Sequence, residues 1–323
     1  GENITTGTIN TLIGGLAGDA LTQGNSNIAI GYQALTSETK GDRNVAIGVD
    51  ALYTQNNTSD TDVYNVAIGY YAGRLVSTGA HNTIVGGLAG DALTTGSYNV
   101  AIGRSALTTE DTGSRNVAIG KSALGMLNYD GEGYNVAVGY EAGAAVTTGI
   151  QNTILGGLAG DALTTATGNV AIGYNSLSTE DTGGRNVAIG WGTLSNLDAD
   201  ANSYNVAIGY NAANDMTTAL QNVVIGGFAA DAITTGSYNI AIGYNALTAE
   251  TGANRNTAIG YFALSAQNKG SGDANNVAVG HSAGQNISTG TKNVIIGNVA
   301  GENLTTAVEN TVVGYEALSD AVT

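Results

Sequence analysis

The sequence has no cysteine and no proline, two histidines, and only 10 lysine and arginine residues against 26 aspartate and glutamate residues. Without cysteine there is neither a disulfide framework nor a thiolate metal site. Two histidines are too few to favour histidine-based catalysis or a histidine-rich metal centre. A formal net charge of −16 with so few basic residues predicts no binding to nucleic acid or to an anionic membrane surface.

Long apolar runs are also missing. No run approaches the roughly 18 residues that a membrane-spanning helix needs, so membrane insertion is not expected. What the chain has in abundance is glycine, with 49 residues among 323, and a short phrase that recurs eighteen times. Each copy has Asn at its first place, Ile, Val or Leu at its fourth, and Gly at its fifth.

The spacing of this phrase is nearly constant. Thirteen of the seventeen intervals between successive opening Asn residues have the same length, as from Asn82 to Asn99, and the other four are slightly longer. The long intervals begin at Asn44, Asn116, Asn186 and Asn256, so the units come in groups of four. The extra residues predict four longer loops at one edge of the fold, at Tyr53–Tyr64, Gly125–Tyr134, Ser195–Tyr204 and Ser265–Asn275.

The apolar runs are four or five residues long, β-branched and interrupted by Gly, which favours strands over helices. A unit of about 17 residues with one firm strand and Gly turns has the size of one coil of a β-solenoid. We therefore predict an all-β fold, a parallel β-solenoid (β-roll) of about 18 coils in four-coil super-repeats. Residues 1–323 are expected to form a single repetitive domain, a segment of a longer fibre.

Stacked coils place the same residue in the same environment, which explains the repetition. The Ile, Val or Leu before each Gly is expected to fill the core. The Gly is expected to turn the chain with positive φ or to lie where no Cβ fits. The stacked Asn side chains can form a ladder of amide hydrogen bonds along the solenoid. The predicted structural rows include Asn27, Asn44, Asn65, Asn99 and Asn116, and Gly31, Gly48, Gly69, Gly103 and Gly120.

Phrases such as "NIAIGYQAL" from Asn27, "NTAIGYFAL" from Asn256 and "TGSRNVAIGKSAL" around Asn116 cover almost the whole chain in variants. They resemble the repeat region of bacteriophage tail-fibre proteins and the head repeats of trimeric autotransporter adhesins. This resemblance implies a β-roll in an extracellular fibre of a virion or a cell surface, commonly trimeric. The adhesin repeats are usually shorter than the unit in this chain, and no coiled-coil stalk or membrane anchor is present in this sequence.

Motifs for chemistry are weak. The Asp in "GGLAGDAL", from Gly86, recurs only once in each group of four units, whereas a calcium-binding solenoid repeats its Asp in every short turn. Glu110 and Asp111 form an acidic pair followed by Arg115, which we interpret as a solvated ion-pair loop rather than a glycosidase site. We therefore predict no catalytic residues, no cofactor and no metal.

Aromatic residues offer the candidate binding or interface positions. Most lie directly after the Gly of the phrase, where packing at coil edges or at a subunit interface competes with a stacking surface for sugars. The longer loops are a second candidate, because insertions on one side of a solenoid often form a binding face. The candidates are Tyr32, Tyr70, Tyr140, Tyr174, Trp191, Tyr210 and Tyr244 after the Gly, and Tyr129, Asp130 and Asp198 in the loops.

These features together favour a non-enzymatic structural fibre protein, most like a phage tail-fibre shaft or receptor-binding fibre segment. The alternatives are a bacterial surface adhesin or self-assembling extracellular filament and, remotely, a solenoid carbohydrate-processing enzyme. The expected partners are further copies of the chain, in a trimer or an end-to-end filament, and a cell-surface glycan or receptor. The expected location is extracellular, on a virion fibre or a cell surface.

Overall fold

The computed structural model describes residues 1–59 and 61–320. The regular secondary structure of these residues consists of β-strands, without helices. The chain divides into two compact units, Gly1–Thr165 and Ala166–Thr323. The first unit contains β1 (Thr11–Ile13), β2 (Ile28–Ile30), β3 (Gly41–Asp42), β4 (Val45–Ile47), β5 (Thr61–Asp62), β6 (Val66–Ile68), β7 (Thr83–Val85), β8 (Val100–Ile102), β9 (Val117–Ile119), β10 (Val136–Val138) and β11 (Thr153–Leu155).

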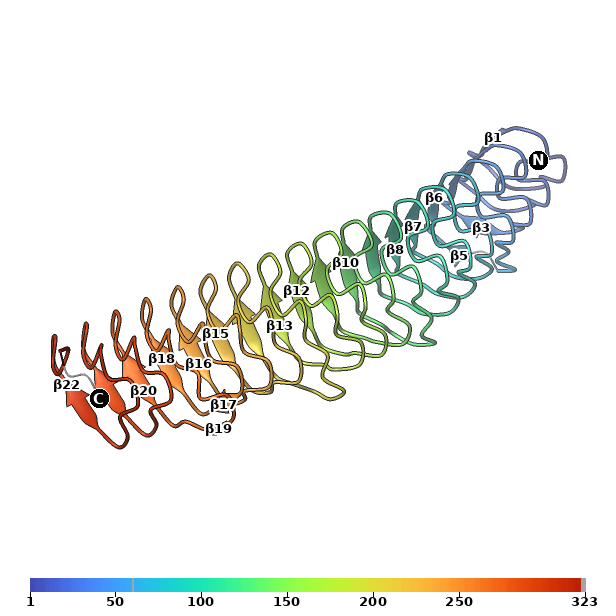
Figure 1. Cartoon of the computed structure of the whole chain (residues 1–323). Helices are drawn as coiled ribbons and strands as arrows, with labels where there is room; N and C mark the ends of the chain where they lie inside the picture. Colours follow the sequence, from blue (N-terminus) through green and yellow to red (C-terminus); the bar gives the residue numbers. More distant parts are fainter. Residues whose placement is uncertain (60, 321–323) are drawn as a thin grey trace. The chain divides into compact units, whose positions relative to one another are not determined.

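The second unit continues the same series of short strands (Figure 1). It contains β12 (Val170–Ile172), β13 (Val187–Ile189), β14 (Val206–Ile208), β15 (Val223–Ile225), β16 (Ile240–Ile242), β17 (Ala253–Asn254), β18 (Thr257–Ile259), β19 (Gly272–Asp273), β20 (Val277–Val279), β21 (Val294–Ile296) and β22 (Thr311–Val313).

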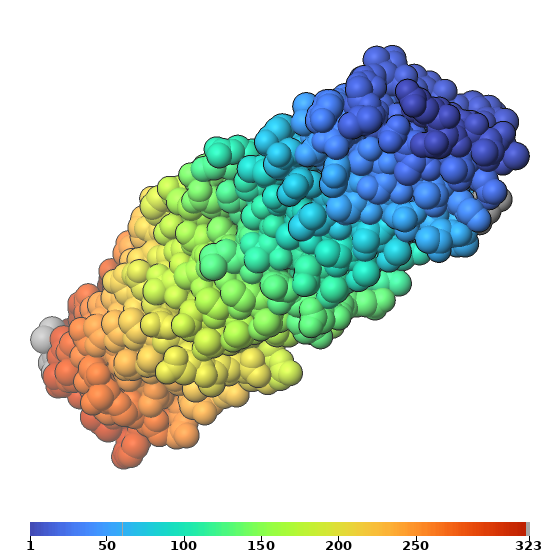
Figure 2. Space-filling view, turned by 90° about the vertical axis from the view of Figure 1, so that its right-hand side faces the viewer, coloured from blue at the N-terminus to red at the C-terminus, as the bar shows by residue number. Residues whose placement is uncertain are grey.

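Within each unit the three-residue strands pair in parallel and in register with the strands of the neighbouring coils. Val100 of β8 faces Val117 of β9, and Ala101 faces Ala118. Consecutive coils lie directly against one another, as the even progression of colour within each unit shows (Figure 2). The predicted parallel β-solenoid of about 18 coils is confirmed. The two-residue strands pair separately, β3 with β5 and β17 with β19, where the first and last of the longer loops rejoin the stack.

The core is built from different residues than predicted. In a three-residue strand the side chains alternate, so only the middle one can point inward. That residue is Ala118 in β9, which is fully buried, whereas Ile119 is only partly buried. The prediction that the Ile, Val or Leu before each Gly fills the core is therefore wrong. These residues, together with the residue after each Asn, form the outward face of the sheet.

The rest of the core comes from the arc that follows the strand. In the coil of β8 the buried apolar residues are Ala101 from the strand and Ala106 and Leu107 from the arc. Large and small residues compensate for one another between coils. The middle residue of β7 is Ile84, where most strands have Ala. A Cβ added to Gly73, in the preceding coil, would lie 2.9 Å from Cδ1 of Ile84, so position 73 has no room for a side chain.

The Gly that follows each three-residue strand is needed for two reasons, its positive φ and its close contact with the next coil. Gly31 has φ +134°, a backbone conformation that L side chains rarely adopt. A Cβ at Gly31 would also lie 2.5 Å from the carbonyl oxygen of Gly48 in the next coil. Gly48, Gly69, Gly103 and Gly120 share this conformation, with φ of 136°, 139°, 127° and 136°.

The buried Asn side chains join each coil to the next. Oδ1 of Asn99 accepts the backbone N–H of Asn116 at 3.0 Å, and its Nδ2 donates to the carbonyl of Gly113 at 2.8 Å. One side chain therefore holds the turn that closes its own coil and the first residue of the next coil. The same pair of bonds is made by Asn27, with Asn44 N (2.9 Å) and Gly41 O (2.9 Å), and by Asn65, with Asn82 N (2.8 Å) and Gly79 O (2.7 Å).

Direct bonds between Asn amides accompany this pattern in some coils. Nδ2 of Asn44 donates to Oδ1 of Asn27 at 3.1 Å, and Nδ2 of Asn116 lies 3.5 Å from Oδ1 of Asn99. The contact to backbone is the more regular one in the described coils. Asn27, Asn65 and Asn99 thus each satisfy a backbone donor and a backbone acceptor, and leaving such groups unpaired costs about 1–3 kcal/mol each. Asn256 is an exception, because its Nδ2 has no hydrogen-bond partner among the described residues.

The first prediction tests the orientation of the strand by placing threonine at two neighbouring positions. Ala118→Thr adds volume and a hydroxyl to a fully buried site, and we expect a loss of about 2–4 kcal/mol of stability. Ile119→Thr changes an outward residue to another β-branched one and should cost less than about 1 kcal/mol. Denaturant unfolding followed by circular dichroism measures both. A larger effect at Ile119 than at Ala118 would reverse the assigned faces.

The second prediction tests the Asn clamp with an isosteric change. Asn99→Asp keeps the acceptor for Asn116 N–H, but it removes the donor to Gly113 and buries a charge. We expect a loss of about 3 kcal/mol or more in the free energy of unfolding. Asn128→Asp introduces the same charge at an exposed position and serves as the control. Equal unfolding midpoints for the two variants would show that the side-chain donor is dispensable.

Candidate functional site

Four glutamates occupy core positions. Glu38, Glu110, Glu180 and Glu250 each lie eleven residues after an opening Asn and are fully buried. In most other coils the same position holds an apolar residue, such as Leu93. Each glutamate belongs to the coil that precedes one of the longer loops. Buried glutamates therefore occur in the core only beside the longer loops, among the described residues.

The carboxylate of Glu110 shows what these residues do. Its Oε1 accepts the N–H of Gly113 at 2.7 Å, and its Oε2 accepts the N–H of Tyr129 at 3.1 Å. Gly113 lies in the turn of the same coil, whereas Tyr129 lies in the loop of the next coil. The carboxylate thus supplies acceptors to backbone donors that the irregular loop leaves without a strand partner.

The same arrangement recurs in the second unit. Glu180 accepts the N–H of Gly183 at 2.6 Å and the N–H of Ala199 at 3.1 Å. Glu38 has a fuller set of partners, because Gln55 donates its side-chain Nε2 to Oε2 at 2.9 Å in addition to the backbone bonds. We assign to these glutamates the role of positioning the loops.

The interpretation of Glu110 and Asp111 as a solvated ion-pair loop is wrong for Glu110. This side chain is buried, and Arg115 bonds instead to Glu132 at 2.7 Å across coils. The reason is geometric: residues in neighbouring coils lie closer than residues five apart along the arc. The Arg115–Glu132 pair is exposed on both sides, so it contributes little to stability.

Burial sets the protonation behaviour of the glutamates. Desolvation raises the pKa of Glu110 above its ordinary value, although the N–H bonds from Gly113 and Tyr129 oppose this effect. Desolvation likewise raises the pKa of Glu180. Glu132 at the surface behaves in the opposite way, because hydrogen bonds from Tyr134 and Arg115 lower its pKa.

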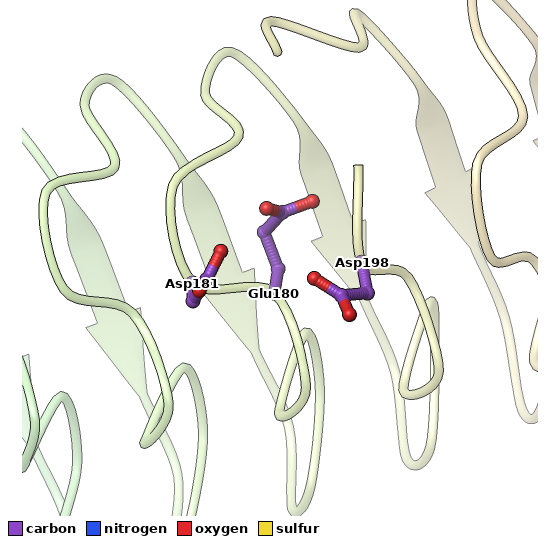
Figure 3. A group of neighbouring side chains, drawn as sticks. All are labelled: Glu180, Asp181 and Asp198. Carbon is purple, nitrogen blue, oxygen red and sulfur yellow. The ribbon is translucent and has the colours of Figure 1, made fainter. Parts of the chain in front are cut away.

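One acidic cluster has the separation that a metal ion would require. Glu180 and Asp181 from one coil and Asp198 from the next each offer an oxygen within 4.8 Å of the other two (Figure 3). A calcium site needs six to eight oxygen ligands, and both oxygens of Glu180 already accept backbone N–H bonds. The cluster therefore fits the positioning of a loop better than the capture of a cation.

The loops are shorter than the sequence suggests. Leu127 and Leu197 fall inside the predicted loops Gly125–Tyr134 and Ser195–Tyr204, but both are fully buried in the core. The exposed part of the first loop contains Asp130, whose Oδ1 accepts the hydroxyl of Thr112 at 2.9 Å, and a partly exposed Tyr129. Asp60, in the loop Tyr53–Tyr64, lies outside the described residues.

The candidate aromatic residues after the Gly are about half exposed and lie in one row along the coils. In the second unit Tyr174, Trp191 and Tyr210 stack on one another, with ring centroids 6.3 and 5.1 Å apart and interplanar angles of 18° and 10°. The next coil has Gly227 at the place of these rings, so the row lacks an aromatic residue there. Phe228 contacts Tyr210 and Tyr244 edge-on, with ring centroids 5.2 and 6.0 Å apart, and connects the two sides of the row.

In the first unit the same row is interrupted. Tyr70 stacks on its chain neighbour Tyr71, and Tyr140 lies 4.8 Å from the ammonium of Lys121. No ring of the described residues stacks on Tyr32. The structure therefore brings together the candidates of the second unit and keeps those of the first unit apart.

The stacking bears on the choice between packing and sugar binding. A sugar binds an aromatic residue through the open face of the ring, but the faces of Trp191 are covered by Tyr174 and Tyr210. The centroid separations of 5.1 and 6.3 Å leave no room for a sugar ring between them. The covered faces favour a packing role for the part of this row formed by Tyr174, Trp191 and Tyr210.

The buried glutamates are the functional residues that the sequence analysis missed. The signal that identifies them is positional: an acid stands where most other coils place Leu, Val, Ile or Met and two place Gln (Gln55 and Gln267), and only next to a longer coil. Comparison of each coil with the others, position by position, would have revealed it.

Comparison of the chain with models of known protein families, with curated proteins and with solved structures finds no match. Among the described residues, none belongs to a helix with the length and apolar character required to cross a bilayer.

The third prediction concerns pH. A carboxyl whose pKa is raised by folding stabilises the protein below its ordinary pKa and loses that contribution as the pH rises through the raised value. We expect Glu110→Gln to flatten the dependence of stability on pH between the raised pKa of Glu110 and the ordinary glutamate value of about 4.3. Unfolding midpoints measured across this range would test the slope.

The matched control is Glu132→Gln. Because the pKa of Glu132 is lowered in the folded chain, its contribution is lost as the pH falls. Removal of this group should therefore make the gain on acidification steeper at and below the ordinary glutamate pKa of about 4.3, opposite in sign to the effect at Glu110. The same slope in both variants would mean that burial of Glu110 carries no protonation cost.

Proposed function

We propose that this chain is a non-enzymatic structural fibre protein, most like a phage tail-fibre shaft, whose copies associate through the outward face of the sheet. The observation that carries the proposal is the character of this face. In the first unit one row of outward residues runs Val45, Val66, Thr83, Val100, Val117, Val136 and Thr153, and the second row runs Ile47, Ile68, Val85, Ile102, Ile119, Val138 and Leu155.

These rows are uncharged and, apart from Thr83 and Thr153, aliphatic. None of the three-residue strands in the described chain contains a charged residue, and the outward residues are partly exposed throughout, with Ile68 at 37%. A contiguous exposed apolar face is the usual mark of an interaction site on a soluble protein. Three residues of width over nine strands cover on the order of 400 Å² in one unit, from strand spacing and rise alone.

We infer that a second copy of the chain covers this face, because the face carries no charge that would oppose the approach of a copy. The chain carries −16 formal charges, so two copies repel over most of their surface. The uncharged face is the surface on which they can approach without bringing carboxylates together. The regular rows also suit self-association, because each copy presents the same spacing as its partner.

The resemblance to tail-fibre and adhesin repeats supports the fibre role and an extracellular location on a virion or cell surface. The chain has about 18 similar coils but no cysteine and only two histidines, and this scarcity of catalytic residue types supports a shaft rather than an enzyme. Immunogold electron microscopy of native particles, with antibodies raised against this chain, tests the role directly. Label along a projecting fibre is expected, and label confined to cell contents would contradict the proposal.

The fourth prediction tests the interface. Ile102→Lys places a charge in the outward row, and we expect it to weaken self-association about 100-fold or more, because an unpaired charge would be buried against the partner. Sedimentation velocity over a range of concentrations measures this. Thr95→Lys adds the same charge at an exposed position outside the strands and should leave association unchanged.

Wild-type protein that remains a 32.2 kDa monomer at every concentration would overturn the association that this proposal requires. Folding of both lysine variants is checked by their circular dichroism and unfolding midpoints. Association weakened as much in Thr95→Lys as in Ile102→Lys would show that the sheet face does not control assembly.

A further inference from the structure

The first unit contains a cavity of about 450 Å³ on the arc side of its coils, within the range of about 300–1,000 Å³ that is usual for small-molecule sites. Four consecutive coils contribute to it, those that open with Asn99, Asn116, Asn135 and Asn152. The lining divides into hydroxyl groups, carboxylates and a small apolar patch that includes Met126.

The cavity exists because two side chains are small. Nine residues after their opening Asn, two successive coils carry Gly125 and Ala144. The equivalent positions in the preceding four-coil group hold Tyr53 and Arg74. The corresponding space in that group is therefore filled by the chain itself, whereas here it is open.

The side chains around Arg74 indicate which kind of ligand would suit the open cavity beside Gly125 and Ala144. The guanidinium of Arg74 lies 5.9 Å from the ring centroid of Tyr53 and 4.8 Å from that of Tyr71, and its Nε lies 3.8 Å from Oδ2 of Asp50. A cation on an alkyl stem thus occupies this place in the first group, next to a carboxylate. The preceding group serves as an internal example of an occupied site.

The open cavity retains carboxylates but has lost this cation. Asp161 lines it, and its buried Oδ1 has no hydrogen-bond partner among the described residues. Glu141 also lines it and forms an ion pair with Lys121 at 3.4 Å, so Asp161 is the carboxylate of the cavity that lacks a cation in the place of Arg74. Burial raises the pKa of Asp161 above its ordinary value, and the charge of Glu141 acts in the same direction, so Asp161 lacks a compensating cation.

We propose that this cavity binds an alkylammonium or alkylguanidinium group, with the cation at the carboxylates of Asp161 and Glu141 and the stem against Met126 and Ala144. The hydroxyls of Ser105 and Ser122 line the same cavity and supply acceptors for the remaining N–H groups. The ligand is a small amine or guanidine, or an Arg or Lys side chain of another protein. A neutral alcohol of the same length lacks the charge that Asp161 requires.

The experiment measures binding of agmatine, a butylamine that carries a guanidinium, by isothermal titration calorimetry at about 0.15 M salt, where surface attraction is screened. We expect wild-type protein to bind one agmatine at the cavity. Asp161→Asn should weaken binding at least about tenfold, because a charge-assisted hydrogen bond is lost. Ala144→Arg should abolish it by filling the cavity as Arg74 does in the first group.

Two controls separate this site from general attraction to an acidic chain. Asp200→Asn removes the same charge at an exposed position outside the cavity and should leave the affinity unchanged. In the opposite direction, the double variant Tyr53→Gly with Arg74→Ala should open the equivalent space and add a second agmatine site, with a larger gain in thermal midpoint than in the wild type. No second site in this double variant would overturn the equivalence on which the ligand class rests.

The neutral probe 1,5-pentanediol tests the need for charge. The proposal would be overturned if the diol bound as tightly as agmatine or if the wild type did not bind agmatine. It would also be overturned if Asp161→Asn and Ala144→Arg both bound agmatine with the affinity of the wild type. N-acetyl-arginine amide separates the two sources of the cation. Tighter binding of this compound than of agmatine identifies a partner's side chain, and the reverse identifies a free amine or guanidine; either result supports the shared chemistry.

Discussion

The constraint on which this structure depends is the in-register stacking of coils, which sets every residue about 4.8 Å from its counterpart in the next coil. At the end of each strand this spacing leaves no room for a side chain, since a Cβ on Gly31 would meet the carbonyl of Gly48 at 2.5 Å. At the start of the strand it allows one Asn to satisfy a donor of the next coil and an acceptor of its own. The repeat in the sequence is the direct record of these two requirements.

The same spacing limits where charge can be buried. A carboxylate repeated in every coil would lie within about 5 Å of its copies and repel them in a low-dielectric core. Glu38 and Glu110 are separated by four coils, so each is isolated from the next among apolar neighbours such as Leu93. The cost of burying each acid is offset by the backbone donors of the adjacent longer loop, which would otherwise lack partners. Loops and buried acids therefore occur together.

The period and the strand composition were enough to predict the parallel solenoid and the length of its coils. They were not enough to orient the strand, because alternation in three residues fits two faces equally well, and the greater hydrophobicity of Ile119 points to the wrong one. The inward position is occupied by Ala118 because the narrow coil has little space between its strand and its arc. The position of Glu110 and the stacked rings around Trp191 depend on contacts between coils, which spacing along one coil does not reveal.

The four-coil super-period explains how a repetitive chain can carry an individual site. A change at one position of a strict single-coil repeat would recur in every coil and give a continuous groove. With groups of four, the pair Gly125 and Ala144 occurs at one place alone, where an earlier pair of coils carries Tyr53 and Arg74, and the result is a local open hollow rather than a continuous groove. The strand side cannot vary in this way, because its rows are required for stacking and for the apolar face. Specific binding is therefore expected on the arc side, where the fold tolerates differences between groups.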